Sequence, residues 1–149
     1  MSIPGGDKDH LLLLLQTAKN RLEYLTRNDW ILIVDKARPI NFKKEEVLIA
    51  HKRFTRKVYL LAKGTARSEG NAQVHISKIG PGEVCGEMSF LESREASASV
   101  IADEEVMTYA IDWAALQELF ELFPHLASRF YQSLAVNLSR RVREQNAAR

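Results

Sequence analysis

The middle of the chain, residues 40–112, alternates short runs of β-forming residues with turn signals and shows no helical spacing. The runs are PINF, EVLIA, KVYLLA, TARSE, AQVHISKI, ASASVIA and VMTYAID. Parallel strands need long crossover connections, usually helices, and none separates these runs. The pattern therefore predicts a closed antiparallel barrel or jelly roll of seven or eight short strands, of the cupin-like kind.

Helical spacing precedes this region. Apolar residues recur from Leu11 to Leu25, and Thr26 followed by Asp29 resembles a helix start. We expect two helices over residues 8–37, broken near Leu25. The leucine run HLLLLL is too short for a membrane span and lacks the basic start of a signal peptide, so it predicts the buried stripe of a helix.

Helical spacing also follows the strands. An amphipathic stretch begins at Trp113 and stops at Pro124, with Trp113 and Phe120 as expected core residues. A last helix is expected over residues 125–146. Its apolar seam predicts either packing on the barrel or a two-fold dimer through paired helices; the seam consists of Tyr131, Ala135, Leu138 and Val142.

The predicted fold class is α+β, a jelly roll flanked by N-terminal helices and two C-terminal helices. A length of 149 residues suits one domain. We expect a helical extension over residues 1–25 and the main domain over residues 26–149. The net charge of +2 is too balanced to indicate nucleic acid, and the arginines clustered after residue 139 are interpreted as a solvated helix end.

The residues favour binding without catalysis. The single Cys85 forms no internal disulfide and fits a small core residue in a reducing, cytoplasmic protein. The four histidines are scattered, with no metal-ligand spacing; His75 is interpreted as structural or solvated. No nucleophile–base pair stands out. We expect no enzyme activity, no metal and no cofactor.

A glycine-rich segment, residues 80–99, is the candidate binding loop. Its glycines let backbone N–H groups approach a ligand and form an anion-sized concavity. Glu87 can accept hydrogen bonds from hydroxyls, which suits a sugar better than a phosphate. Arg94 and Arg67 are candidate cations near it. The alternative is a plain β-turn with a surface loop.

These segments together resemble the cyclic nucleotide-binding domain, the family of the catabolite activator protein and the regulatory subunits of cAMP-dependent kinase. The resemblance rests on INFKKEEVLIA, VYLLAKGTAR and ISKIGPGEVCGEMSFLESREASASVIA and covers roughly residues 26–141. It implies that Glu87 accepts the ribose 2′-hydroxyl and that residues 131–138 form a lid over the base. It places these residues around a cAMP or cGMP ligand: Gly86, Glu87, Met88, Ser89, Arg94, Ala96, Ser97, Ala98 and Ser99.

The chain departs from the family pattern at the phosphate-binding arginine, whose place is taken by Ala96. Glu45 and His51 stand near two early turns where the family has glycines. Two hypotheses follow: a sensor that couples a cyclic nucleotide or similar anion to movement of the last helix, or a degenerate domain that binds none and serves dimerisation or docking. Few residues follow the last helix, so we expect no DNA-binding helix-turn-helix in this chain alone.

Overall fold

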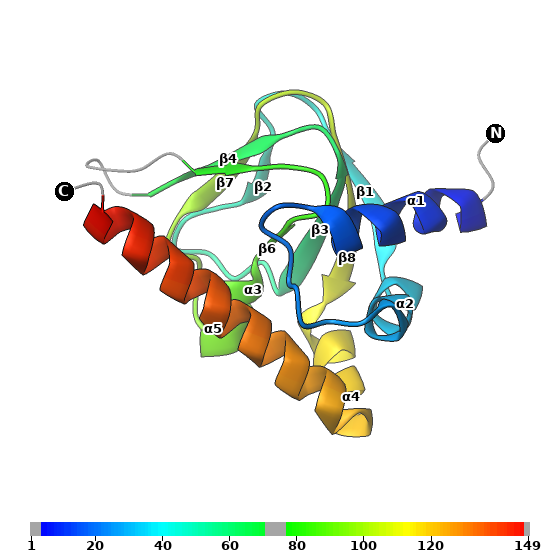
Figure 1. The fold of residues 1–149 in the computed structure, drawn as a ribbon. Helices are drawn as coiled ribbons and strands as arrows, with labels where there is room; N and C mark the ends of the chain where they lie inside the picture. The colour runs from blue at the N-terminus through cyan, green and yellow to red at the C-terminus, as the bar shows by residue number, and fades with distance from the viewer. Residues whose placement is uncertain (1–3, 71–76, 148–149) are drawn as a thin grey trace.

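A computed structural model describes residues 4–70 and 77–147 and contains two antiparallel four-stranded sheets packed face to face (Figure 1). The first sheet has the order β1 (Arg38–Phe42), β8 (Val106–Asp112), β3 (Lys57–Lys63), β6 (Val84–Cys85). The second has the order β2 (Val47–Ile49), β7 (Ser99–Ala102), β4 (Ala66–Glu69), β5 (Ser77–Ile79). The predicted α+β jelly roll is confirmed.

The two central strands of the first sheet are buried on both faces, which explains why they read as nearly continuous apolar runs. In β3, Val58 and Leu60 face the helices, whereas Tyr59 and Leu61 face the barrel interior. In β8, Ile111 faces the helices and Ala110 the interior. The molecule therefore has two cores, one inside the barrel and one between this sheet and the helices.

Helices cover the outer face of the first sheet. Helix α1 (Pro4–Thr17) buries Leu11 and Leu15 completely. Helix α2 (Arg27–Asp35) begins at a capping box in which the Thr26 hydroxyl accepts from the Asp29 N–H and the Asp29 carboxylate accepts from the Thr26 N–H. The two predicted N-terminal helices are confirmed. Within the described residues, no helix is long and apolar enough to cross a membrane.

At the other end, α4 (Trp113–Leu122) is followed at once by α5 (Pro124–Ala147), so Pro124 opens a new helix as well as ending the old one. Phe120 is buried as expected, whereas Trp113 is only partly buried. The N-terminal half of α5 buries Leu126, Phe130 and Leu134 in the helical core.

The predicted apolar seam of α5 lies mainly outside that core. Tyr131 is 43% exposed and Val142 is 54% exposed; Ala135 is exposed as well, and only Leu138 is partly buried. The interpretation that the seam packs on the barrel is therefore wrong for most of its residues, because the buried face of α5 is the neighbouring one.

Two elements were missed in the glycine-rich segment, where we expected only a loop: β6 and the short helix α3 (Glu87–Glu92). The other predicted strand runs all contain a strand. The first part of AQVHISKI, with His75, lies outside the described residues, and β5 accounts for its end.

Candidate functional site

The glycine-rich segment runs from the turn before β6, through α3, to β7, and we call residues 80–100 the cassette. Two of its glycines are required by close backbone packing. A Cβ on Gly82 would lie 2.3 Å from the Leu14 carbonyl oxygen of α1, and one on Gly86 would lie 2.6 Å from the Lys57 carbonyl oxygen of β3. Both glycines have positive φ, 84° and 90°. Packing alone thus accounts for these two glycines.

Glu87 opens helix α3 and is partly buried. Burial raises the pKa of its carboxyl to about 7, although the Arg141 guanidinium and the backbone N–H groups of Glu87 and Met88 act to lower the pKa. A carboxyl that is half protonated near neutrality can accept or donate a hydrogen bond to a ligand hydroxyl.

Ala96 lies inside the barrel core, with only 5% of its surface exposed. Its N–H donates to the Arg53 carbonyl at 3.0 Å, and its carbonyl accepts from the Lys52 N–H at 2.8 Å. This pairing fixes the backbone and directs the methyl group toward the same cluster as Ile49 and Val100. The position expected for the phosphate-binding arginine is therefore a small apolar core position in this chain.

The two candidate cations do not replace that arginine. Arg67 donates to the carboxylates of Glu45, Glu69 and Asp103 at 2.8, 2.6 and 2.7 Å. Strand pairing places it beside Ile101, on the face of β4 opposite the buried Ala66. Arg94 is exposed, and its side chain forms no ion pair within the part of the chain that the structure describes.

The remaining predicted site residues lie along the cassette. Met88 and Ser89 are partly buried in α3, and the Ser89 carbonyl accepts from the Arg94 N–H at 3.1 Å. Ser97 is exposed and Ala98 is partly buried. The Ser99 hydroxyl accepts from the His51 N–H at 3.0 Å, so it already has one partner. All nine predicted residues fall within the stretch from Gly86, directly after β6, to Ser99, the first residue of β7.

The early turns adopt the glycine-like conformation despite lacking glycine. Glu45 has φ 70°, and its N–H donates to the Ala102 carbonyl at 2.7 Å. At the second turn the positive φ, 65°, belongs to Lys52, one residue after the expected His51. Both turns border β2, which pairs with β7 at the end of the cassette.

Helix α5 contacts the cassette where the Phe130 ring lies 6.2 Å from the Phe90 ring, and the role of Arg141 in this helix was missed. The expected lid, residues 131–138, contacts the segment between α1 and α2: the Ser133 hydroxyl accepts from the Tyr24 N–H at 3.0 Å. The positive charge that acts to lower the pKa of Glu87 is that of Arg141, further along the helix. Arg140 pairs with Glu23 at 2.6 Å. Arg140 and Arg141 were interpreted as part of a solvated helix end, but both interact with other segments of the chain. Only the folded structure shows these interactions.

Cys85 is buried in the barrel core, as expected, and burial raises its pKa well above the usual value. A thiol in this state is a poor nucleophile. No group of three or more His, Cys, Asp or Glu side chains with metal-binding geometry occurs in the described ranges.

Comparison with known proteins agrees with this arrangement. The model of the cyclic nucleotide-binding domain matches residues 39–122, more than half of the chain. Cyclic GMP-binding protein C of Dictyostelium discoideum is 31% identical over 93% of this chain, which spans 6% of that protein. The cyclic AMP receptor protein of Thermus thermophilus is 36% identical over 58% of this chain and 40% of its own length.

A solved structure shows the same fold. The catabolite activator protein of Thermus thermophilus has a TM-score of 0.68 and 25% identity, covering 85% of this chain and 60% of that one. The chain thus spans less than two thirds of the length of each of these relatives. The matched region includes β1 to α4 and the whole cassette. The chain belongs to the cyclic nucleotide-binding domain family.

Proposed function

We propose that this chain is a regulatory sensor domain in which a cyclic nucleotide binds at the cassette and shifts the C-terminal half of α5. The proposal is supported by the contact between the cassette and α5, where the Phe90 and Phe130 rings lie 6.2 Å apart, and by the Arg141 charge of α5, which acts to lower the pKa of Glu87. A ligand hydroxyl that hydrogen-bonds Glu87 changes the charge and surroundings that Arg141 meets. The ligand then favours one position of the helix over another by its different affinity for the two.

In this proposal, different groups of the chain bind different parts of the nucleotide. Glu87 takes the ribose hydroxyl, and backbone N–H groups of the cassette face the cyclic phosphate, with the exposed Ser97 and Arg94 beside them. Arg94 is available because it is not held by a carboxylate of the described residues, in contrast to Arg67. The unit that carries this function is proposed to span residues 26–149, in a cytoplasmic protein.

Affinity is expected to be modest. An arginine–phosphate contact is worth about 1.5–3 kcal/mol, so its absence lowers affinity by roughly 10- to 100-fold. We expect binding that is specific but weaker than in a domain that retains the arginine.

The test is calorimetric titration of the chain with cAMP and with cGMP, using Glu87→Gln and the matched control Glu92→Gln at the exposed end of α3. We expect the unmodified chain and Glu92→Gln to bind equally, and Glu87→Gln to bind about tenfold more weakly. The proposal would be overturned if neither cAMP nor cGMP gave a binding heat.

A second candidate function is favoured by the burial of Ala96 in the barrel core. In it the domain binds no nucleotide, and the exposed seam of α5 mediates a homodimer or docking to another protein. The experiment is thermal unfolding of Ala96→Arg with and without nucleotide. Burying an unpaired guanidinium lowers Tm, and recovery of the Ala96→Arg Tm with cAMP or cGMP would identify a pocket that lacks only its arginine. The unmodified chain is measured alongside, and a rise in its own Tm with nucleotide would reject the second candidate.

A further inference from the structure

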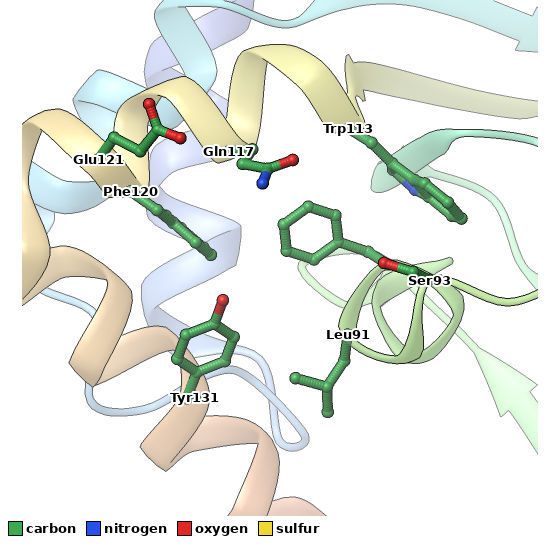
Figure 2. A pocket seen from close by; sticks show the side chains of 8 residues that line it. Leu91, Ser93, Trp113, Gln117, Phe120, Glu121 and Tyr131 are labelled. Atoms are coloured by element: carbon green, nitrogen blue, oxygen red, sulfur yellow. The ribbon is translucent and has the colours of Figure 1, made fainter.

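A cavity of about 330 Å³ lies where α3 of the cassette meets α4 and α5 (Figure 2). Four aromatic side chains line it, from all three helices: Phe90, Trp113, Phe120 and Tyr131. Its size falls within the range of small-molecule sites. None of the nine predicted ligand residues of the cassette lines the cavity, although Tyr131 belongs to the expected lid.

The aromatic rings meet at steep angles and form corners. The Phe90 and Phe120 rings lie 5.7 Å apart at 78°, and the Phe120 and Tyr131 rings lie 5.5 Å apart at 75°. Aromatic faces are electron-rich and attract cations. A compact tetrahedral cation can contact two perpendicular walls together, whereas a planar guanidinium stacks on one ring.

The charge of the lining has the matching sign. Glu121 is the one ionisable acid or base that lines the cavity besides the Tyr131 phenol, and it forms no ion pair with any described residue. Figure 2 shows the Tyr131 hydroxyl pointing toward the Phe120 ring and the Gln117 amide pointing into the same space. The Glu121 carboxylate at this rim repels an anion and can pair with a cation.

We propose that this cavity binds a small organic ammonium ion, with its positive head against the Phe120 and Tyr131 rings and Glu121 as its counter-ion. Binding here does not require the nucleotide to be present. The occupant touches α3, α4 and α5 together, so it stabilises the position of α5 seen in this structure. If the proposed function also holds, the ammonium ion and the nucleotide change each other's affinity by the same factor.

Trp113 provides the signal for a test. Trp113 lines the cavity, and its indole N–H is buried and has no hydrogen-bond acceptor among the described residues. The chain has two tryptophans, and Trp30 lies 1% exposed in the helical core away from the cavity lining. In a ¹⁵N–¹H spectrum the two indole signals are told apart with Trp113→Phe, and Trp30 serves as the internal control.

The probes are choline and its neutral isostere 3,3-dimethyl-1-butanol, titrated into the unmodified chain. We expect choline to shift the Trp113 indole signal saturably and the alcohol to bind about tenfold more weakly or not at all. The Trp30 signal stays in place. Equal shifts with both probes would show an apolar cavity without cation selectivity and overturn the proposal, as would no shift with either.

Two variants locate the site. Glu121→Gln keeps the size and removes the charge, and Tyr131→Leu keeps an apolar group and removes the ring; each is expected to weaken choline binding about five- to tenfold. The matched control is Glu118→Gln, which removes an exposed charge from the same helix away from the cavity lining. Equal loss in Glu118→Gln and Glu121→Gln would reduce the effect to general surface charge and contradict the assignment.

Discussion

The two halves of α5 are held in different ways. Residues 124–135 bury three large side chains in the helical core, and Arg129 donates two hydrogen bonds to the buried Asp29 at 2.6 and 2.8 Å. Residues 136–147 contain no fully buried residue, and Asn137 and Arg140 link them to the rest of the chain by polar contacts. One half is part of the folded core, and the other lies on its surface.

This difference indicates which part of α5 can move when a ligand binds. Moving the first half exposes apolar surface and breaks a buried ion pair, which costs several kcal/mol. Moving the second half breaks solvent-exposed pairs, each worth about 0–1 kcal/mol. The Arg141 charge that acts on Glu87 belongs to the second half. The proposed response is therefore a local displacement after residue 135.

Truncation of an apolar side chain in each half should show the largest contrast. Phe130, 2% exposed, contacts the rings of Phe90 and Phe120. Phe130→Ala is expected to lower the free energy of unfolding by about 3–5 kcal/mol. Val142→Ala, at a 54% exposed position, should stay within about 0.5 kcal/mol. Urea unfolding measures both, and similar losses would mean that both halves are equally packed.

The ion pairs of the two halves give the next contrast. Burial acts to raise the pKa of Asp29, but hydrogen bonds from Arg129 and Thr26 lower it below its usual value, so the carboxylate stays charged. Asp29→Asn weakens this pair and the α2 capping box and should cost about 2–4 kcal/mol.

Glu23→Gln removes the corresponding partner of Arg140 in the second half and should cost less than about 1 kcal/mol. Chemical denaturation at pH 7 compares the two variants. The account would be contradicted by a Glu23→Gln loss as large as that of Asp29→Asn.

Glu87 predicts a pH dependence. Its pKa rises from 4.5 in the unfolded chain to about 7 in the folded one, so the folded state binds more protons between these values. The free energy of unfolding therefore falls as pH rises from about 4.5 to about 7. Glu87→Gln removes this contribution. The free energy of unfolding of Glu87→Gln minus that of the unmodified chain should therefore be about 1–3 kcal/mol higher at pH 8 than at pH 4.5. Parallel pH profiles for the two proteins would contradict the buried, protonated carboxyl.

The smallest effect concerns the end of α3. Ser93 has φ 53°, a conformation that favours glycine. Ser93→Gly is expected to change the free energy of unfolding by about 0.5–1 kcal/mol in the stabilising direction. Thermal unfolding measures it, and a clear loss would show that the Ser93 side chain makes a stabilising contact.

The strand runs could be predicted from the sequence because β3 and β8 carry strong apolar signals and the turns between runs are polar. The turn at Glu45 was noted only as lacking the glycine of the family, and its positive φ was not predicted. Helix α3 was missed because a six-residue helix has too few turns to show periodicity. The link between Arg141 and Glu87 joins residues far apart in sequence, so no local pattern signals it. Ala96 was identified as a departure, but its place in the barrel core depends on pairing with Arg53.

Amide hydrogen exchange along α5, with and without saturating cGMP and cAMP, tests the central claim most directly. We expect nucleotide to change exchange after residue 135 while the amides around Phe130 keep their protection. Unchanged exchange throughout α5 with both nucleotides, or an equal change in both halves, would contradict the proposed coupling between the cassette and the C-terminal half of the helix.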